Sequence, residues 1–187
     1  MNVWLALLLA AVALSVERVC YVWIARAPES FLRWCARLPR AARCSPIAVV
    51  CVLFVVFKLV QGAVLLGWDL ARGDGLPTVT ASPAAVVGVA LVLVGQTLST
   101  LVFYRLGWIG IFFGDRLGYA VSWCRAFPFS VLAHPQYVGA VMTIWGLFLI
   151  TRFPHEDWVL VPALETALYM VGAHLEGVGF RPVVVGV

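Results

Sequence analysis

The sequence contains few charged residues. Of its 187 residues, 12% are charged and 63% are hydrophobic, and the mean hydropathy is +1.00. This composition excludes an ordinary soluble domain. A transmembrane helix requires about 20 apolar residues, so a chain of this length has room for about four or five spans and little else. We therefore expect one all-α, membrane-embedded domain over residues 1–187.

The sequence also lacks the spacings that are typical of metal sites. Its five cysteines form no CxxC pair, show no Cys/His spacing that would suit zinc, and suggest no disulfide framework. We interpret most of them as small apolar fillers. The net charge of +4 is modest and carried mainly by arginine, which in a membrane protein usually sets topology and meets anionic headgroups. We therefore expect neither a metal nor a nucleic-acid partner.

Five apolar stretches make up most of the chain. They lie at about 3–24, 46–68, 83–104, 136–151 and 158–176. A signal peptide would be an alternative for the first stretch, but its start carries no Lys or Arg and its apolar character resumes after Glu17 and Arg18, which favours a retained helix. The last two stretches flank a polar turn and predict a C-terminal helical hairpin.

Arginines are concentrated in one short loop, which predicts the topology. Five arginines and a single glutamate lie between residues 25 and 45, so this loop belongs on the cytosolic side. Three prolines argue against a long helix there. Residues 69–82 form a lumenal loop, and Ser82 with Pro83 begins the next helix. The N-terminus is then lumenal, and residues 106–135 and the C-terminus are cytosolic.

Two groups of ionisable residues lie inside the predicted spans. Lys58 and Gln61 share a helical face, and either snorkelling to the interface or lining of a site would explain Lys58. Glu17 and Arg18 are adjacent, and the pattern favours snorkelling or self-pairing near the interface. The sharper alternative is a buried partner for Lys58.

The third span carries a stripe of small residues. Ala84, Gly88, Gly95 and Ser99 fall on one helical face, so another backbone or a ligand could come close. Plain helix packing is the commoner explanation, while Gln96 in the middle of the span favours a site.

The segment that follows the third span is unlike the others. LGWIGIFFGDRLG is too rich in glycine and too polar to cross a bilayer quietly, and too aromatic to be a solvated loop. Its glycines would line one face of a helix and its aromatic residues a neighbouring face. We predict an interfacial segment over residues 106–135, beginning with an interfacial helix, and we expect the chemistry to take place there.

Three pieces of sequence taken together carry a family resemblance. LGWIGIFFGDRLG, then FPFSVLAHPQYVG, then HLEG after the hairpin resemble the small membrane phospholipid N-methyltransferases, most of all their compact plant and fungal type. The resemblance runs from about Val94 to Glu176. It implies transfer of methyl groups from S-adenosyl-L-methionine to phosphatidyl-N-methylethanolamine and phosphatidyl-N,N-dimethylethanolamine, which yields phosphatidylcholine. Phosphatidylethanolamine is a further candidate substrate.

The same resemblance implies a cofactor site and a location. The family binds S-adenosylmethionine through a Gly-x-Gly on the third span and a Glu-Glu pair at the end of the last. The matching positions are Leu93, Val94 and Gly95 with neighbouring Gln96, and Leu175 with Glu176. Both are half-matches, because Leu93 and Leu175 replace a glycine and a glutamate. The family also implies the endoplasmic reticulum membrane, with the active site facing the cytosol.

Methyl transfer to an amine needs alignment and exclusion of water more than a covalent nucleophile. The lipid amine must first lose a proton, which Asp115 or His134 could accept. Tyr137, in the turn after His134, is a third candidate catalytic residue. For substrate binding, aromatic rings would attract the methylated ammonium and arginines the phosphate; the candidates are Trp108, Phe112, Arg116, Tyr119 and Arg125.

Two other functions stay open at this point. An isoprenylcysteine carboxyl methyltransferase also uses an HPxYxG-like turn, but it typically has Arg before the His, where this chain has Ala133. A non-catalytic, lipid-binding helix bundle would explain the small-residue stripe. It would not explain why Asp115, His134 and Glu176 gather on one side of the membrane.

Overall fold

The computed structural model is all-helical in every part that it describes, namely residues 2–39, 44–72, 79, 81–122, 124–151 and 156–177. Among them, the side chains of a few helix-end residues, including Glu176, lie outside the description. The elements are α1 (Val3–Arg26), α2 (Pro28–Arg37), α3 (Pro46–Arg72), α4 (Pro83–Ile111), α5 (Pro135–Ile150), the 3-10 turn η2 (Glu156–Val159) and α6 (Leu160–Gly177).

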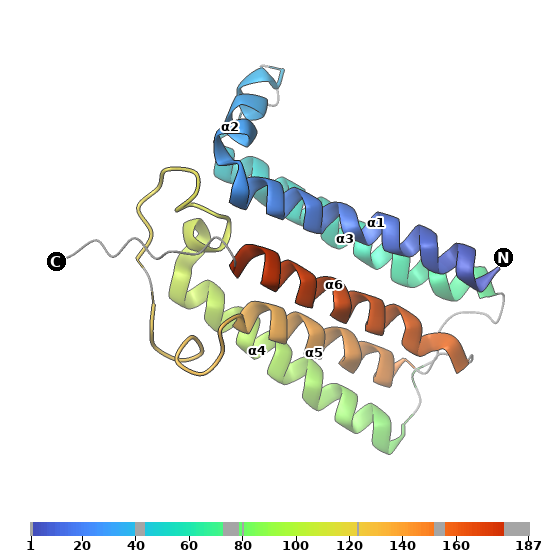
Figure 1. Ribbon diagram of the computed structural model, residues 1–187. Coiled ribbons are helices and arrows are strands. Elements are labelled where there is room, and N and C mark those ends of the chain that lie inside the picture. The colour runs from blue at the N-terminus through green and yellow to red at the C-terminus, as the bar shows by residue number, and fades with distance from the viewer. Residues whose placement is uncertain are drawn as a thin grey trace.

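Five of these helices lie side by side as a bundle (Figure 1). Among the described residues, α1, α3 and α4 are long and apolar enough to cross a membrane, and α5 and α6 are shorter apolar helices. The predicted all-α membrane bundle with a C-terminal helical hairpin is therefore confirmed. The helix boundaries lie close to the predicted ones, except that α3 and α4 run further.

Capping residues fix where the helices begin. The Asn2 side chain accepts the N–H of Trp4 at 2.9 Å, and the Ser82 hydroxyl accepts the N–H of Ala85 at 3.1 Å. Each cap satisfies a backbone donor that has no partner within the first turn. Pro83, the first residue of α4, needs no such acceptor, so the predicted Ser82–Pro83 start is confirmed.

The predicted basic loop contains a short helix. α2 leaves the bundle at an angle (Figure 1) and carries exposed Arg33 and Glu29, paired at 3.8 Å. Phe31 on the opposite side of α2 is fully buried and packs edge-on against Trp23 of α1. The burial of Phe31 is what anchors α2 to the bundle.

α4 and α5 make the most extensive helix contact in the described part of the chain. A Cβ atom on Gly95 would lie 2.5 Å from the Gly139 carbonyl oxygen, and one on Gly88 would lie 2.6 Å from that of Gly146. Only glycine allows two backbones to come this close. Helix packing therefore accounts for Gly88 and Gly95 in the small-residue stripe.

The region after the third span is not the regular interfacial helix that we predicted. Gly107 has φ +64° and breaks the helical geometry of α4, and the chain leaves the helix at Phe112. Phe113 and Gly118 also have positive φ values, 57° and 87°, which a continuous right-handed helix does not allow. The glycines therefore allow a compact series of turns over residues 112–118 and line no common helical face.

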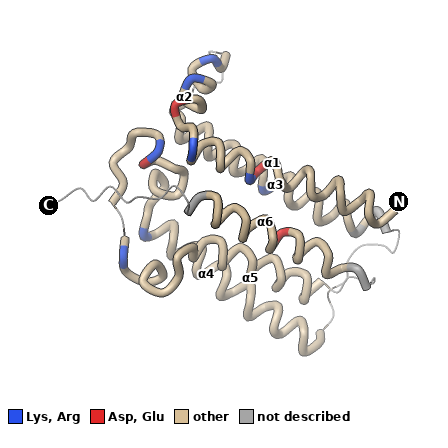
Figure 2. The backbone as a smooth tube through the Cα atoms, in the orientation of Figure 1, with Lys and Arg blue, Asp and Glu red and all other residues tan. Residues whose placement is uncertain are grey.

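The ends of the bundle differ in charge. The N-terminus, the ends of α3 and α5 and the start of α4 lie at one end, whereas α2, residues 112–134 and the end of α6 lie at the other (Figure 1). Charged residues of the described part gather at the α2 end and in one group inside the bundle (Figure 2). The described loops are therefore grouped at the two ends of the bundle as the topology predicted.

Candidate functional site

A cavity of about 900 Å³ lies between the helices and residues 112–134. Residues of α1, α3, α4, α5 and α6 line it, together with Phe112, Phe113, Asp115, Arg116, Phe129, Ala133 and His134. The wall is mostly apolar, with a small number of polar side chains. A large, mainly apolar cavity with few polar groups is typical of a small-molecule binding site.

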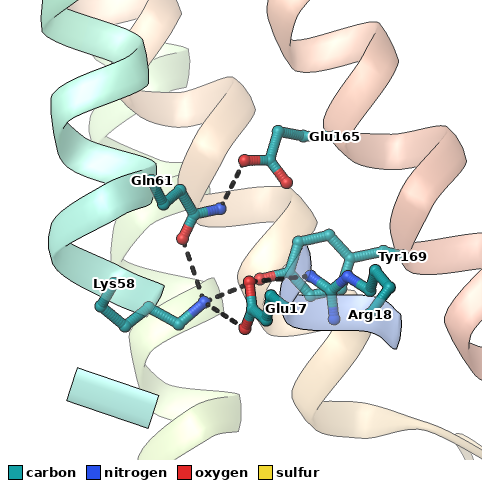
Figure 3. A network of polar contacts seen from close by, with 6 residues as sticks. All are labelled: Glu17, Arg18, Lys58, Gln61, Glu165 and Tyr169. Carbon is teal, nitrogen blue, oxygen red and sulfur yellow. Dashed lines mark hydrogen bonds and ion pairs between the residues drawn. The ribbon is translucent and has the colours of Figure 1, made fainter. Parts of the chain in front are cut away.

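The Glu17 carboxylate lies at the centre of a polar network in this wall (Figure 3). It is 3.3 Å from Lys58 Nζ and 3.6 Å from Arg18 Nη2, and its own side chain is only 6% exposed. One carboxylate thus bridges a cation from α1 and a cation from α3. Glu17 and Arg18 do pair with each other, as we favoured, but as buried residues of the bundle, and the alternative of a buried partner for Lys58 is confirmed for Glu17.

The network continues from α3 to α6 through neutral groups (Figure 3). Lys58 Nζ donates to Gln61 Oε1 at 3.0 Å and to the Tyr169 hydroxyl at 3.2 Å, and Gln61 Nε2 donates to Glu165 Oε1 at 2.7 Å. Because Lys58 also lines the cavity, the site-lining explanation of this residue is confirmed. Snorkelling is not needed to explain it.

The Arg18 guanidinium lies close to aromatic rings of α5 and α6. Its central carbon lies 3.8 Å above the Tyr169 ring and 5.8 Å from the Tyr137 ring. Gly172 leaves room for it, because a Cβ there would lie 3.3 Å from Arg18 Cδ. Stacking on an aromatic face stabilises a desolvated guanidinium.

The candidate catalytic residues all line the cavity. The His134 ring stacks on Tyr137, with a centroid distance of 5.7 Å and an interplanar angle of 15°. The Asp115 carboxylate is 3.4 Å from Arg116 Nε, and both side chains are partly exposed. Pro135 begins α5, so the backbone turn at His134 holds His134 and Tyr137 in the same corner of the cavity.

The predicted cofactor residues are less close together. Gln96 lines the cavity and donates to Thr143 Oγ1 at 3.1 Å. Leu93 and Val94 are 63% and 48% exposed on the outside of the bundle, and Gly95 packs on Gly139. The Leu175 carbonyl accepts from Arg26 Nη2 at 2.9 Å. The side chain of Glu176 lies outside the described residues.

Some of the predicted substrate residues line the cavity and others do not. Phe112 and Arg116 line the cavity, whereas Trp108, Tyr119 and Arg125 are exposed and not among its lining residues. Trp108 packs edge-on against Phe112 at a centroid distance of 4.9 Å, so it supports the wall from outside.

Sequence reasoning missed Glu165 and Tyr169. Glu165 is 1% exposed and Tyr169 is 4% exposed, and both belong to the network. An acid inside an apolar stretch is a functional candidate by the cost of burying it, so that cost alone would have identified Glu165. No comparable signal exists for Tyr169. The described residues contain no group of three or more His, Cys, Asp and Glu side chains that could hold a metal ion.

Comparison with known proteins gives a consistent result. Residues 83–177 match the phospholipid methyltransferase family. The chain is 29% identical over 137 residues to the phosphatidyl-N-methylethanolamine N-methyltransferase of Arabidopsis thaliana, which covers 73% of this chain and 75% of that protein. No solved structure matches the chain significantly.

Two further relatives match over a shorter region. The phosphatidylethanolamine N-methyltransferase of Rattus norvegicus is 34% identical over 91 residues, 48% of this chain and 45% of that protein. The phosphatidyl-N-methylethanolamine N-methyltransferase of Saccharomyces cerevisiae is 31% identical over 91 residues, 48% of this chain and 43% of that protein. Both matches therefore span less than half of the relative.

The apolar helical bundle and its cavity define a membrane protein with a mostly apolar cavity that a few polar side chains line. The chain belongs to the phospholipid methyltransferase family, whose match covers just over half of its length. This membership makes the protein a phospholipid N-methyltransferase and argues against a non-catalytic scaffold.

Proposed function

We propose that the chain methylates phosphatidyl-N-methylethanolamine and phosphatidyl-N,N-dimethylethanolamine to phosphatidylcholine, with S-adenosyl-L-methionine as the methyl donor. Phosphatidylethanolamine is a further candidate substrate. The observation that carries the proposal is that His134, Tyr137 and Asp115, all within the family match, line one cavity. The names of the relatives support the choice of lipid class.

The cavity suits the methyl donor in size and chemistry. Its volume of about 900 Å³ falls within the range of sites for drug-sized ligands. The donor supplies an electrophilic methyl group on a positively charged sulfonium. The ring faces of Phe112 and Tyr137 line the cavity and attract positive charge. Gln96 offers a polar side chain on α4, and Glu176 would answer the ammonium of the amino-acid head.

The chain's own residues would align the amine and remove its proton. The apolar wall excludes water, so the amine keeps its lone pair free for an in-line attack. His134 and Asp115 are the candidate acceptors of the proton. Because the Asp115 carboxylate already pairs with Arg116, we favour His134, whose ring is oriented by stacking on Tyr137.

The orientation follows from the charge distribution. α2 and residues 112–134 lie at the same end of the bundle, and that end carries most of the exposed arginines (Figure 2). Positively charged loops stay in the cytosol. We therefore propose that this end faces the cytosol, in the endoplasmic reticulum membrane.

Incorporation of labelled methyl groups tests the proposal. Membranes that contain the protein receive labelled S-adenosylmethionine and, in parallel, phosphatidylethanolamine, its monomethyl form, its dimethyl form or a prenylcysteine analogue. We expect label to appear in phosphatidylcholine when the monomethyl or the dimethyl lipid is supplied, and the phosphatidylethanolamine sample decides whether the first step is also performed. Label in the prenylcysteine analogue alone would show that the proposed lipid substrates are wrong and that the proposed methyl donor is right.

A further inference from the structure

The charged wall of the cavity comes largely from outside the family match. Arg18 and Glu17 belong to α1 and Lys58 to α3, whereas the match begins at residue 83. Yet all three side chains line the same cavity as His134 and Tyr137. The family's shared region therefore does not by itself complete the site.

The Arg18 side chain has unused hydrogen-bonding capacity. It is only 6% exposed, but its Nε and Nη2 atoms have no hydrogen-bond acceptor among the described residues. Among the described residues, the carboxylate within ion-pair distance of it is that of Glu17, which is 3.6 Å from Nη2 and is shared with Lys58 at 3.3 Å. A buried guanidinium with free N–H groups is costly unless a partner satisfies it.

The local charges also favour an incoming anion. Glu17 is the one carboxylate within ion-pair distance of Arg18 and Lys58 among the described residues, so two cations share one anion. Glu165, the second acid of the network, is bonded to the neutral amide of Gln61. The ring faces of Tyr137 and Tyr169 hold the guanidinium in place without neutralising it (Figure 3).

We infer that Arg18, supported by Lys58, binds an oxyanion of a ligand in the cavity. The ligand's identity rests on the proposed function, which offers two oxyanions: the carboxylate of the methyl donor's amino-acid head and the phosphate of the lipid headgroup. Both accept paired N–H groups from a guanidinium. Arg18 lies beside Gly172, which is one helical turn before Glu176 on α6. Glu176 is the residue expected to bind the ammonium of the amino-acid head, so the carboxylate of the same head is one candidate.

Measurements of ligand binding and of kinetics on the Arg18→Gln variant distinguish the carboxylate of the donor from the phosphate of the lipid. S-Adenosylhomocysteine, which does not react, and its decarboxylated analogue are titrated onto the purified protein in lipid nanodiscs, and the KM for dimethyl-phosphatidylethanolamine is measured in parallel. Arg33→Gln, on the exposed face of α2, is the matched control, and both of its constants should stay at the wild-type values.

Either of two results supports the inference. If Arg18 binds the carboxylate, Arg18→Gln raises the Kd of S-adenosylhomocysteine at least tenfold, and the wild-type preference over the decarboxylated analogue disappears. If it binds the phosphate, the lipid KM rises at least tenfold while the Kd for S-adenosylhomocysteine stays the same. Both constants within twofold of wild type in folded Arg18→Gln would overturn the inference.

A second variant covers the case in which Arg18→Gln does not fold. Arg18→Lys keeps the charge beside Glu17 but lacks the planar pair of N–H groups that a guanidinium presents to an oxyanion, so the same constant should rise several-fold. Constants within twofold of wild type in this variant overturn the inference as well. Failure of the proposed function is a separate result, in which the wild-type protein itself neither binds S-adenosylhomocysteine nor methylates lipid.

Discussion

At the scale of single residues, the polar side chains inside the bundle form a connected network. Glu17, Lys58 and Gln61 link α1 to α3, and Glu165 and Tyr169 extend the chain of contacts to α6. Burying a polar group is costly unless another group satisfies it, so these contacts stabilise the fold. Several of the same side chains line the cavity, so one network would serve both folding and the ligand binding that we propose.

Removal of Lys58 should destabilise the protein. Lys58→Met leaves Glu17 with the longer of its two ion pairs and removes the donor to Gln61 and Tyr169. The Lys58 side chain is 35% exposed but the Glu17 carboxylate is buried, so losing the pair leaves a buried charge poorly compensated and should appear as a clear drop in Tm in detergent. Arg33→Met is the control, because its pair with Glu29 is exposed and worth about 1 kcal/mol or less. Equal Tm values for the two variants would contradict the structural role of Lys58.

Glu176 remains a prediction from the family resemblance. Glu176→Gln should raise the KM for S-adenosylmethionine by a factor of about ten, the scale of one charge-assisted hydrogen bond to the ammonium of the amino-acid head. The kcat at saturating donor should change much less. An unchanged KM would remove Glu176 from the donor site.

At the scale of the elements, sequence patterns identified the helices but not how they are joined. The apolar stretches and the Ser82–Pro83 cap predicted five apolar helices with nearly correct boundaries, and three of those in the described residues are long enough to cross a membrane. The break at Gly107 could not be predicted, because a glycine is compatible with a helix and with a positive φ alike. The bridge between Glu17 and Lys58 also depends on which helices pack together, and the sequence does not encode that in any local pattern.

The glycines of the α4–α5 contact give a prediction about elements. Gly139→Ala places a Cβ atom 2.6 Å from the Gly95 carbonyl oxygen, so the two helices have to separate and Tm should fall by several degrees. Gly67→Ala on α3 is the matched control, because a Cβ there has no neighbour within 4 Å. Its Tm should be unchanged or slightly higher. A similar loss in both variants would show that α4 and α5 tolerate a wider spacing.

At the scale of the whole molecule, the arrangement of the ends predicts which residues share a side of the membrane. Cys44 lies two residues before the start of α3 and Cys124 lies within residues 112–134, and both of these segments are at the α2 end of the bundle. Val79 lies four residues before α4, which begins at the opposite end. A membrane-impermeant maleimide should label the native protein from the cytosolic side. A single-cysteine variant, Val79→Cys in a background without the other cysteines, should react only from the lumenal side. Labelling of both from one side would overturn the topology.

Cys35 provides an internal control for this experiment. It is buried on the inner side of α2, and burial raises the pKa of the Cys35 thiol. A raised pKa leaves less thiolate at a given pH, so Cys35 should react more slowly than Cys44 at neutral pH. The rate at which Cys35 is labelled should approach that of Cys44 as the pH is raised or after detergent unfolds the protein.

The buried bridge between α1 and α3 has a consequence for biosynthesis. α1 leaves the ribosome before α3 and carries Glu17 and Arg18 in its C-terminal half. Each charge adds roughly 2.5–3.5 kcal/mol to the cost of inserting an isolated helix at its centre. That cost falls only when Lys58 arrives with α3, so α1 should commit to the bilayer as part of a helical pair.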